Sequence, residues 1–152
     1  MTMHILDNPE HFKKYDKHKV LESILALPKQ CEQSWEEVLR IKLPASYRKV
    51  KNVVIVGMGG STLGGHMIKS IFEKELGVPL EVVNHYTLPA YVHRDTLVIA
   101  ISYSGSTEET LAAVAEAKKR GAKIAGITTG GSLGAWLAKH NLPRYIFKPT
   151  HN

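Results

Sequence analysis

The sequence predicts an α/β fold, with one parallel sheet of five strands and helices covering both of its faces. From residue 51 onward, short apolar runs alternate with longer segments of helical periodicity. The runs are nearly continuous in apolar residues, as strands buried on both faces are. Strands that alternate with helices are joined by crossovers, which makes neighbouring strands parallel. The expected strands lie near 52–57, 80–84, 97–101, 123–127 and 144–148, and the expected helices near 61–76, 107–120 and 131–140.

The first fifty residues are predicted to be helical instead. Asp7 or Asn8 can cap a helix that has Pro9 in its first turn. Pro28 is expected to open a further helix, and Pro44 to end the helical pattern because proline cannot continue a helix. The apolar residues with helical spacing are Val20, Leu21, Ile24 and Leu25 before Pro28, and Trp35, Val38 and Leu39 after it.

Composition indicates an ordinary globular protein. The 152 residues are enough for a substantial core, and the hydrophobic and charged fractions, 43% and 22%, are typical of globular chains. We expect residues 1–50 to form a helical segment that packs on a domain of residues 51–152. No apolar run indicates a signal peptide or a membrane span. The single cysteine, Cys31, cannot form an internal disulfide, so a cytoplasmic setting is expected.

The formal net charge of +6 raises the question of a nucleic-acid partner. The basic residues are scattered, however, and form no stripe interleaved with aromatic side chains. Lys118, Lys119 and Arg120 end a predicted helix that Glu108 and Glu109 begin, so these charges complement the helix dipole. We therefore expect neither a nucleic-acid nor a membrane partner.

Two loops rich in serine and glycine carry the strongest functional signal. Residues 57–62 (Gly-Met-Gly-Gly-Ser-Thr) follow the first predicted strand, and residues 102–107 (Ser-Tyr-Ser-Gly-Ser-Thr) follow the third. Both loops offer hydroxyls and backbone amides at the start of a helix, where the dipole favours an anion, and neither contains a cation. If the strand order is 2-1-3-4-5, both loops flank the crevice at the carboxyl edge of the sheet where ligands bind. This arrangement indicates a site for the phosphate of a small metabolite.

The second loop has more hydroxyls than helix capping requires. Ser102, Ser104, Ser106 and Thr107 can surround a phosphate together with the amides of the following helical turn. Gly105 allows the backbone to approach the ligand. The alternative is that Ser106 or Thr107 caps the helix, but capping uses one hydroxyl and leaves the others unexplained.

The first loop departs from two nucleotide-binding motifs. Thr62 stands where a dinucleotide fingerprint needs glycine or alanine, and the second strand ends at Asn84 with no acidic residue for a ribose. The loop also lacks the lysine of a P-loop. Gly64 and Gly65 lie inside the next predicted helix, where glycine is costly. Either a close approach to a ligand or another backbone, or tight helix–sheet packing, would explain them.

A third loop, residues 128–132 (Thr-Thr-Gly-Gly-Ser), follows the fourth strand. Its position would allow it to line the same crevice. The favoured interpretation is a plain helix cap at Ser132, because a cap hydroxyl satisfies a free amide of the helix without any ligand.

Together these loops resemble the sugar isomerase (SIS) domain. The segment 102–110 (Ser-Tyr-Ser-Gly-Ser-Thr-Glu-Glu-Thr) carries the resemblance, with residues 57–61 and 128–131. The phrase 58–65 (Met-Gly-Gly-Ser-Thr-Leu-Gly-Gly) and the helical lead-in are similar to the first half of the bifunctional phosphoglucose/phosphomannose isomerases. The resemblance covers essentially the whole chain and implies a flavodoxin-like, three-layer αβα sandwich.

The resemblance also implies a substrate and a reaction. The residues implied to bind the substrate phosphate are Ser61, Ser102, Ser104 and Thr107. The residues expected beside the substrate are Gly59, Gly60, Gly105 and Ser106. Family members interconvert glucose 6-phosphate or mannose 6-phosphate with fructose 6-phosphate, using a glutamate base that moves a proton between C1 and C2. The resemblance implies no metal and no organic cofactor, and it implies a homodimer or a higher homo-oligomer.

The chain departs from the family in its length. Family members carry two SIS domains, and their catalytic glutamate, histidine and lysine come from sequence beyond the first. We therefore expect a fragment and assign no catalytic residue. His66, His85 and His93 are interpreted as surface or capping residues, and Glu108 and Glu109 as partners of the helix dipole.

Three functions remain open from the sequence. The leading hypothesis is the phosphosugar-binding domain of an aldose–ketose isomerase for glucose 6-phosphate and mannose 6-phosphate. The second is a single-domain SIS isomerase of another phosphosugar, complete at this length. The third is a regulatory module that senses a phosphosugar without catalysis.

Overall fold

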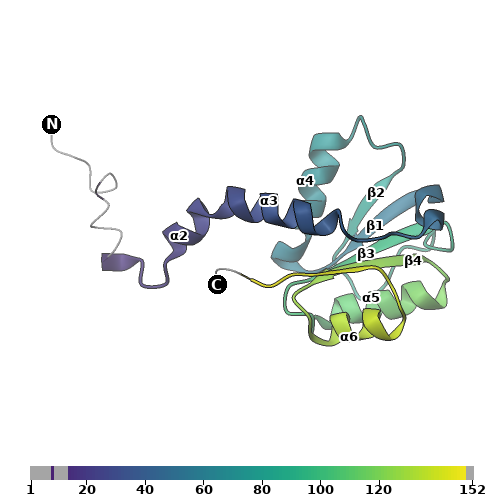
Figure 1. Cartoon of the computed structure of the whole chain (residues 1–152). Coiled ribbons are helices and arrows are strands. Elements are labelled where there is room, and N and C mark those ends of the chain that lie inside the picture. Colours follow the sequence, from purple (N-terminus) through teal and green to yellow (C-terminus); the bar gives the residue numbers. More distant parts are fainter. Residues whose placement is uncertain (1–7, 9–13, 150–152) are drawn as a thin grey trace. The chain divides into compact units, whose positions relative to one another are not determined.

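The computed structural model describes residue 8 and residues 14–149. The expected first helix, with Asp7 or Asn8 as cap and Pro9 in its first turn, lies outside the described residues apart from Asn8 itself. The described chain divides into two compact units, one that reaches Leu39 and one that runs from Arg40 to Lys148 (Figure 1).

The described part of the first unit includes the helices α2 (Val20–Leu25) and α3 (Leu27–Val38). Asp16 caps α2, because its carboxylate accepts hydrogen bonds from the amides of Val20 at 2.6 Å and Leu21 at 2.8 Å. Pro28 lies in the first turn of α3, as the sequence predicts. Neither helix has a buried residue.

The second unit is built on a parallel sheet of five strands in the order β2-β1-β3-β4-β5. The strands are β1 (Asn52–Val56), β2 (Leu80–Val83), β3 (Thr96–Ser102), β4 (Lys123–Thr128) and β5 (Arg144–Ile146). The expected strands are confirmed, and their order is the one under which the first two loops would flank one crevice. Because β1 and β3 are neighbours, the loops that follow them leave the same edge of the sheet side by side.

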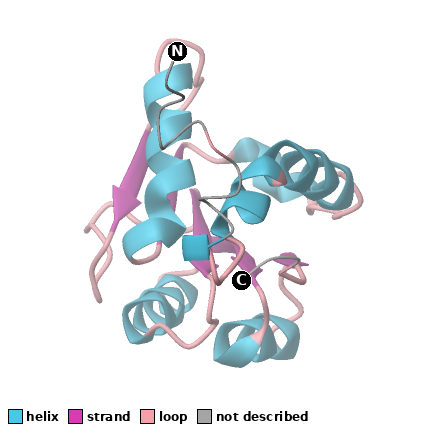
Figure 2. Cartoon of the chain, turned by 90° about the vertical axis from the view of Figure 1, so that its left-hand side faces the viewer, coloured by secondary structure: helices cyan, strands magenta, loops and turns pink. Residues whose placement is uncertain are grey.

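Helices cover the two faces of this sheet unequally. The helices are α4 (Leu63–Phe72), which follows the short 3-10 helix η3 (Gly59–Thr62), then α5 (Glu108–Lys119) and α6 (Gly131–Lys139). Val54 and Val98 share the main core with Val114 of α5 and Leu137 of α6, and α5 and α6 lie below the sheet in Figures 1 and 2. Side chains alternate along a strand, so Ile55 points to the opposite face, where α4 lies.

The two glycines of α4 have different surroundings. A Cβ on Gly65 would lie 2.9 Å from Cδ1 of Ile55 and 3.3 Å from a methyl of Val82, so Gly65 allows α4 to pack tightly on the sheet. A Cβ on Gly64 would meet nothing within 4 Å. Helix–sheet packing is therefore the explanation for Gly65, and Gly64 lies on the open side of α4.

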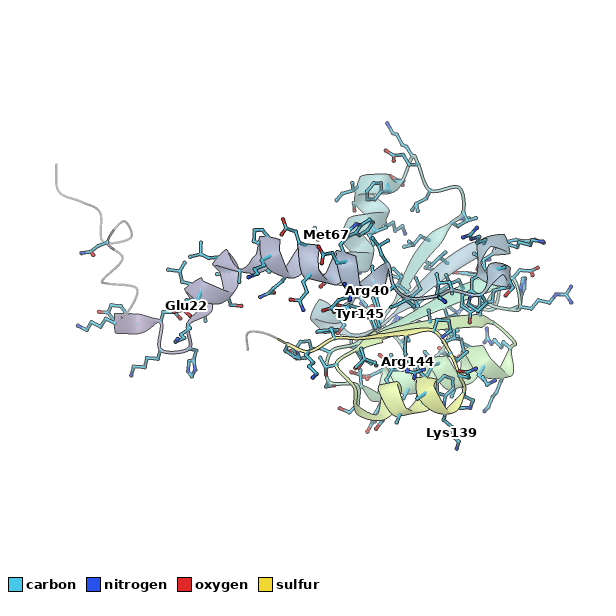
Figure 3. All side chains as sticks on the ribbon, viewed as in Figure 1. Glu22, Arg40, Met67, Lys139, Arg144 and Tyr145 are labelled. Atoms are coloured by element: carbon cyan, nitrogen blue, oxygen red, sulfur yellow. The ribbon has the colours of Figure 1, made fainter. Side chains whose placement is uncertain are left out.

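The outer side of α4 is apolar and exposed. The side chains that form this stripe are Leu63, Met67, Ile68, Ile71 and Phe72, each between 43% and 64% exposed. Met67 is labelled in Figure 3. A stripe of large apolar side chains at helical spacing is unusual on a surface without a partner.

A charged pair on α5 holds the connection between β2 and β3. Glu116 accepts a hydrogen bond from the amide of Leu88 at 2.7 Å, and Arg120 donates to the carbonyl of Pro89 at 2.6 Å. The two side chains also form an ion pair at 2.6 Å. Arg120 therefore fixes a loop in addition to ending the helix.

Tyr47 completes the outer edge of β4 where β5 does not reach. It lies in the 3-10 helix η2 (Ala45–Lys49), which follows Pro44. β5 pairs with β4 only from Gly126 onward. The Tyr47 hydroxyl satisfies both backbone groups of Ile124 that a neighbouring strand would otherwise bond. It donates to the carbonyl at 2.9 Å and accepts from the amide at 3.3 Å.

Candidate phosphosugar site

The first two serine- and glycine-rich loops meet at the carboxyl edge of the sheet. The amide of Tyr103 in the second loop donates to Oγ of Ser61 in the first, at 3.4 Å. At the base of the first loop, a Cβ on Gly57 would lie 2.7 Å from the carbonyl oxygen of Ile101. Only glycine lets the ends of β1 and β3 approach this closely. The structure thus brings together the two loops that the sequence predicts to be neighbours.

The hydroxyls of the second loop form an inner and an outer pair. Ser102 is 1% exposed, and its Oγ lies 2.8 Å from Oγ1 of Thr107 and accepts from the amide of Gly105 at 3.0 Å. Ser104 and Ser106 are exposed, and Oγ of Ser104 accepts from the amide and the hydroxyl of Ser106 at 3.2 and 3.1 Å. The inner pair shapes the loop and the outer pair faces solvent.

The start of α5 has no side-chain cap. Thr107 occupies the cap position, but its side chain makes no capping hydrogen bond and points to Ser102 instead. Helical amides at an uncapped N-terminus lack a partner within the helix, and they favour an anion. Capping by Thr107 therefore does not account for the hydroxyls of this loop.

The third loop lies against the second. Thr129 donates to the carbonyl of Tyr103 from Oγ1 at 2.6 Å and from its amide at 3.4 Å. The amide of Leu133 donates to the carbonyl of Gly105 at 2.7 Å. A Cβ on Gly105, whose φ is +69°, would lie 2.1 Å from the carbonyl oxygen of Gly130. Because the third loop packs on Gly105, a side chain at this position would clash with the backbone of that loop.

The expected helix cap at Ser132 is wrong. The residue at the cap position of α6 is Gly130, with φ of 140°, and Ser132 is the second residue of the helix. No side chain caps α6. The φ of Gly130 favours glycine, and a Cβ on the next residue, Gly131, would lie 2.6 Å from the carbonyl oxygen of Ser104 in the second loop. The cap position falls two residues before the serine.

The other candidate titratable side chains are exposed or already bonded. Nδ1 of His93, which precedes β3, accepts from the amide of Asp95 at 3.0 Å, which is a capping role, and His66 and His85 are exposed. The charge of Glu109, at the start of α5, is the largest cause that raises the pKa of the Tyr86 hydroxyl, followed by burial, the charge of Glu108 and a hydrogen bond with Glu109. Among the described residues, no group of histidine, cysteine and carboxylate side chains is arranged to hold a metal ion.

The glycines of the first loop leave space beside these hydroxyls. Gly59 has φ of 54°, and both Gly59 and Gly60 are exposed with nothing within 4 Å of a Cβ position. Open backbone therefore lies on one side of these hydroxyls, and the uncapped start of α5 on the other. Sequence reasoning missed Thr129, whose hydroxyl fixes the second loop, because its role depends on a contact between distant loops.

Comparison with known proteins agrees with this geometry. Residues 46–142 match the SIS domain. The chain belongs to the SIS domain family. A bifunctional phosphoglucose/phosphomannose isomerase of Caldicellulosiruptor bescii is 43% identical over 79% of this chain and 35% of its own length. The enzyme of the same name from Thermoplasma acidophilum is 40% identical over 70% of this chain and 36% of its own. This SIS chain therefore spans about a third of the length of these relatives.

Solved structures show the same fold. A hypothetical protein from Thermus thermophilus superposes with a TM-score of 0.64 at 25% identity, covering 90% of this chain and 36% of that one. Tagatose-6-phosphate ketose/aldose isomerase from Escherichia coli gives a TM-score of 0.55 at 21% identity, over 91% of this chain and 38% of that one. Within the part of the SIS chain that the structure describes, no helix is long and apolar enough to cross a membrane.

Proposed function

We propose that this SIS domain binds the phosphate of a hexose phosphate and serves an aldose–ketose isomerase that converts glucose 6-phosphate or mannose 6-phosphate to fructose 6-phosphate. The hydrogen bond between Tyr103 and Ser61 carries the proposal, because it joins the two loops at the uncapped start of α5. The names of the relatives support the substrate class. A cytoplasmic location follows from this substrate class.

Each loop has its own part in the proposed binding. Ser61, Ser104 and Ser106 supply accessible hydroxyls, and the amides of the first turn of α5 add backbone donors. Ser102 and Thr107 complete the phosphate cradle from its inner side, where their hydroxyls face each other. Gly59, Gly60 and Gly105 keep the path to the sugar free of side chains.

We assign no general base to the described residues around these loops. A base must reach the proton at C2 of the sugar within hydrogen-bonding distance. His93 precedes β3, at the edge of the sheet opposite the loops, and the charge of Glu109 at the start of α5 complements the helix dipole. We therefore propose that the chain alone binds hexose phosphates and turns them over poorly.

Calorimetry and a coupled assay test the proposal together. Glucose 6-phosphate, mannose 6-phosphate and fructose 6-phosphate should bind, and free glucose should not, because the site recognises the phosphate. Absence of binding by all three esters would refute the phosphate assignment. Full isomerase activity of the chain alone would instead show that it carries its own base.

We also propose that the domain forms a homodimer or a higher homo-oligomer through the apolar stripe of α4. Leu63, Met67 and Ile71 lie on one side of this helix at i, i+4 and i+8, and all three are exposed. Met67→Glu should lower the molar mass measured by light scattering if this face is the interface. Lys74→Glu, on the exposed turn after α4, is the matched control and should leave the mass unchanged.

A further inference from the structure

β2 is a terminal strand of the sheet, and within the described residues no strand pairs with its outer edge. The amide of Val53 in β1 donates to the carbonyl of Pro79 at 2.9 Å. In a parallel pair of strands, the backbone N–H and C=O groups of every second residue point toward the neighbouring strand. In β2 these are the odd-numbered residues, which bond to β1. The N–H and C=O groups of Leu80 and Val82 therefore point outward, available to another strand.

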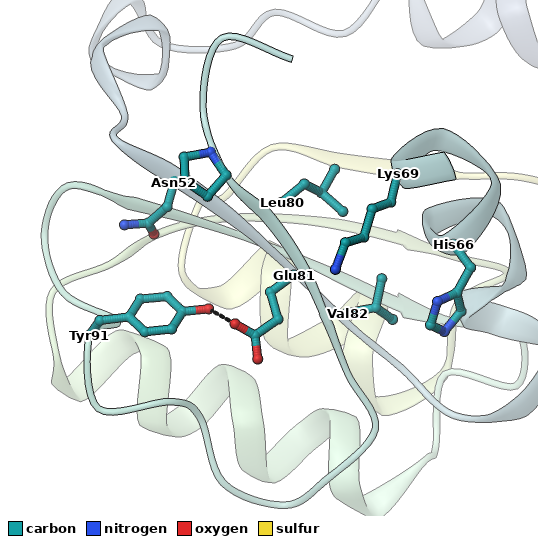
Figure 4. A pocket seen from close by; sticks show the side chains of 8 residues that line it. Asn52, His66, Lys69, Leu80, Glu81, Val82 and Tyr91 are labelled. Atoms are coloured by element: carbon teal, nitrogen blue, oxygen red, sulfur yellow. Dashed lines mark hydrogen bonds between the residues drawn. The ribbon is translucent and has the colours of Figure 1, made fainter. Parts of the chain in front are cut away.

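A groove follows this open edge. A cavity of about 610 Å³ is bounded by His66 and Lys69 of α4 on one side and by Tyr91 on the other (Figure 4). A second cavity of about 460 Å³ shares Lys69 and Leu80 with it and extends to the turn that precedes β2. Both cavities therefore lie along β2, and Tyr91 lines only the larger one.

The side chains of β2 divide between the two walls. Val82 points toward α4, where its methyl lies close to Gly65, and Leu80 is on the same face by alternation. Glu81 points to the other face, where the hydroxyl of Tyr91 donates to its carboxylate (Figure 4). Burial and this bond raise the pKa of the Tyr91 hydroxyl, which keeps it protonated as the donor.

The open charge in the larger cavity is positive. Lys69 extends from α4 toward the strand in Figure 4 and forms no ion pair within the described residues. Among the described residues that line the larger cavity, the only carboxylate is Glu81, which is already bonded to Tyr91. In addition, Oδ1 of Asn52, which lines the same cavity, is buried without a hydrogen-bond partner. The larger cavity thus offers backbone groups, apolar side chains and the ammonium group of Lys69, while the exposed Glu73 lines the smaller cavity.

We propose that the outer edge of β2 binds an extended peptide segment of another protein, which adds to the sheet as a further strand and places an acidic side chain against Lys69. Strand addition of this kind takes its affinity from main-chain hydrogen bonds and its specificity from alternate side chains. A second copy of β2 is a poorer occupant, because antiparallel pairing of two such edges through Leu80 and Val82 sets Glu81 opposite Glu81.

Two synthetic heptapeptides test this on the isotope-labelled full chain by NMR. Both alternate threonine and valine and have blocked ends, and they differ only in a central aspartate or lysine. The aspartate peptide should shift the amide signals of Leu80 and Val82 and slow their hydrogen exchange. It should bind about three-fold more tightly than the lysine peptide, since an exposed ion pair has only a modest effect. Lys69→Glu should reverse this preference.

Val82→Pro removes one outward N–H and should weaken binding of the aspartate peptide by about three- to ten-fold, the effect of one backbone hydrogen bond. Val82→Thr keeps that N–H and should bind the aspartate peptide like the wild type. The proposal fails if neither peptide affects Leu80 and Val82, or if Lys69→Glu leaves the preference unchanged. It also fails if acetate alone reproduces the shifts, or if these signals move with protein concentration in the absence of peptide, since that indicates self-pairing.

Discussion

At the scale of single residues, the hydroxyls of the second loop have distinct surroundings. Ser102 and Thr107 bond to each other, and Ser102 also accepts from the loop amide of Gly105. Ser104 and Ser106 form a second pair that remains exposed. The sequence shows four hydroxyls within six positions and cannot distinguish between them. Only the conformation of the loop decides which pair is buried.

Replacing Ser104 or Thr107 with alanine should weaken hexose phosphate binding. Each substitution removes a hydrogen bond to a charged group, with a cost of about 1.5–3 kcal/mol. Thr107→Ser keeps the hydroxyl and is the matched control, and Ser132→Ala tests a serine that lies outside the second loop. Titration calorimetry measures the affinities. Unchanged affinity in both alanine variants would contradict the phosphate site.

At the scale of elements, contacts between segments far apart in the chain decide how the loops are held. The third loop fixes the second through Thr129, and glycines at 105 and 131 allow their backbones to touch. Glu116 and Arg120 of α5 hold the connection that follows β2. The site loops therefore have a rigid frame, which lowers the entropy cost of ordering them around a ligand.

The two glycines of α4 should respond oppositely to alanine. Gly64→Ala should stabilise the fold by about 0.5–1 kcal/mol, because the position is open and alanine is the better helix former. Gly65→Ala should destabilise it by about 1–3 kcal/mol, because the new methyl group would crowd Ile55. Urea unfolding of the two variants measures the difference. Equal effects would mean that α4 does not pack on the sheet through Gly65.

Tyr47→Phe should change how stability depends on alkaline pH. Burial raises the pKa of the Tyr47 hydroxyl above its ordinary value of 10.0, while its bond to the Ile124 carbonyl opposes this. The protonated hydroxyl is the form that the fold favours. This contribution is complete below pH 10 and is lost as the pH rises through the raised pKa of the folded state.

The expected result is a smaller loss of unfolding free energy above pH 10 in Tyr47→Phe than in the wild type. The phenylalanine variant should also be less stable at neutral pH by about 0.5–1.5 kcal/mol, because Ile124 loses its bonds to the hydroxyl. Parallel pH profiles for the two proteins would show that Tyr47 makes no such contribution.

At the scale of the whole molecule, the chain separates into two units with different content. The sheet, its covering helices and all the proposed phosphate-binding residues belong to the unit from Arg40 to Lys148. The described part of the first unit includes α2 and α3, neither of which has a buried residue. We therefore expect the proposed phosphate recognition to be a property of the second unit.

A chain that lacks residues 1–39 should keep its affinity for hexose phosphates. All the site residues and the core remain in the shortened chain. Calorimetry with glucose 6-phosphate, beside the intact chain as control, measures this. A large loss of affinity in a shortened chain that still unfolds cooperatively would show that the first unit takes part in binding.

Much of this architecture could be predicted from the sequence. The alternation of apolar runs and helical segments predicted the five parallel strands, because strand and helix periodicity are local properties. The order of the strands entered only as a condition, since it depends on how the crossovers pack. The helix expected near 61–76 begins instead as a 3-10 turn and ends at Phe72, since the last turn of a helix depends on its neighbours. The cap at Ser132 was wrong because α6 begins two residues earlier, after Gly130, where Gly131 packs on the second loop.

The sequence by itself determined the fold class and the presence of two hydroxyl-rich loops, because strand periodicity and loop composition depend only on residues that are consecutive in the chain. Tertiary structure alone decided that Ser61 meets Tyr103 and that the third loop packs on Gly105. It also decided that α5 begins without a cap and that β2 has a groove along its open edge. These features depend on distances between residues far apart in the chain, and those distances are set only when the sheet brings the strand ends together.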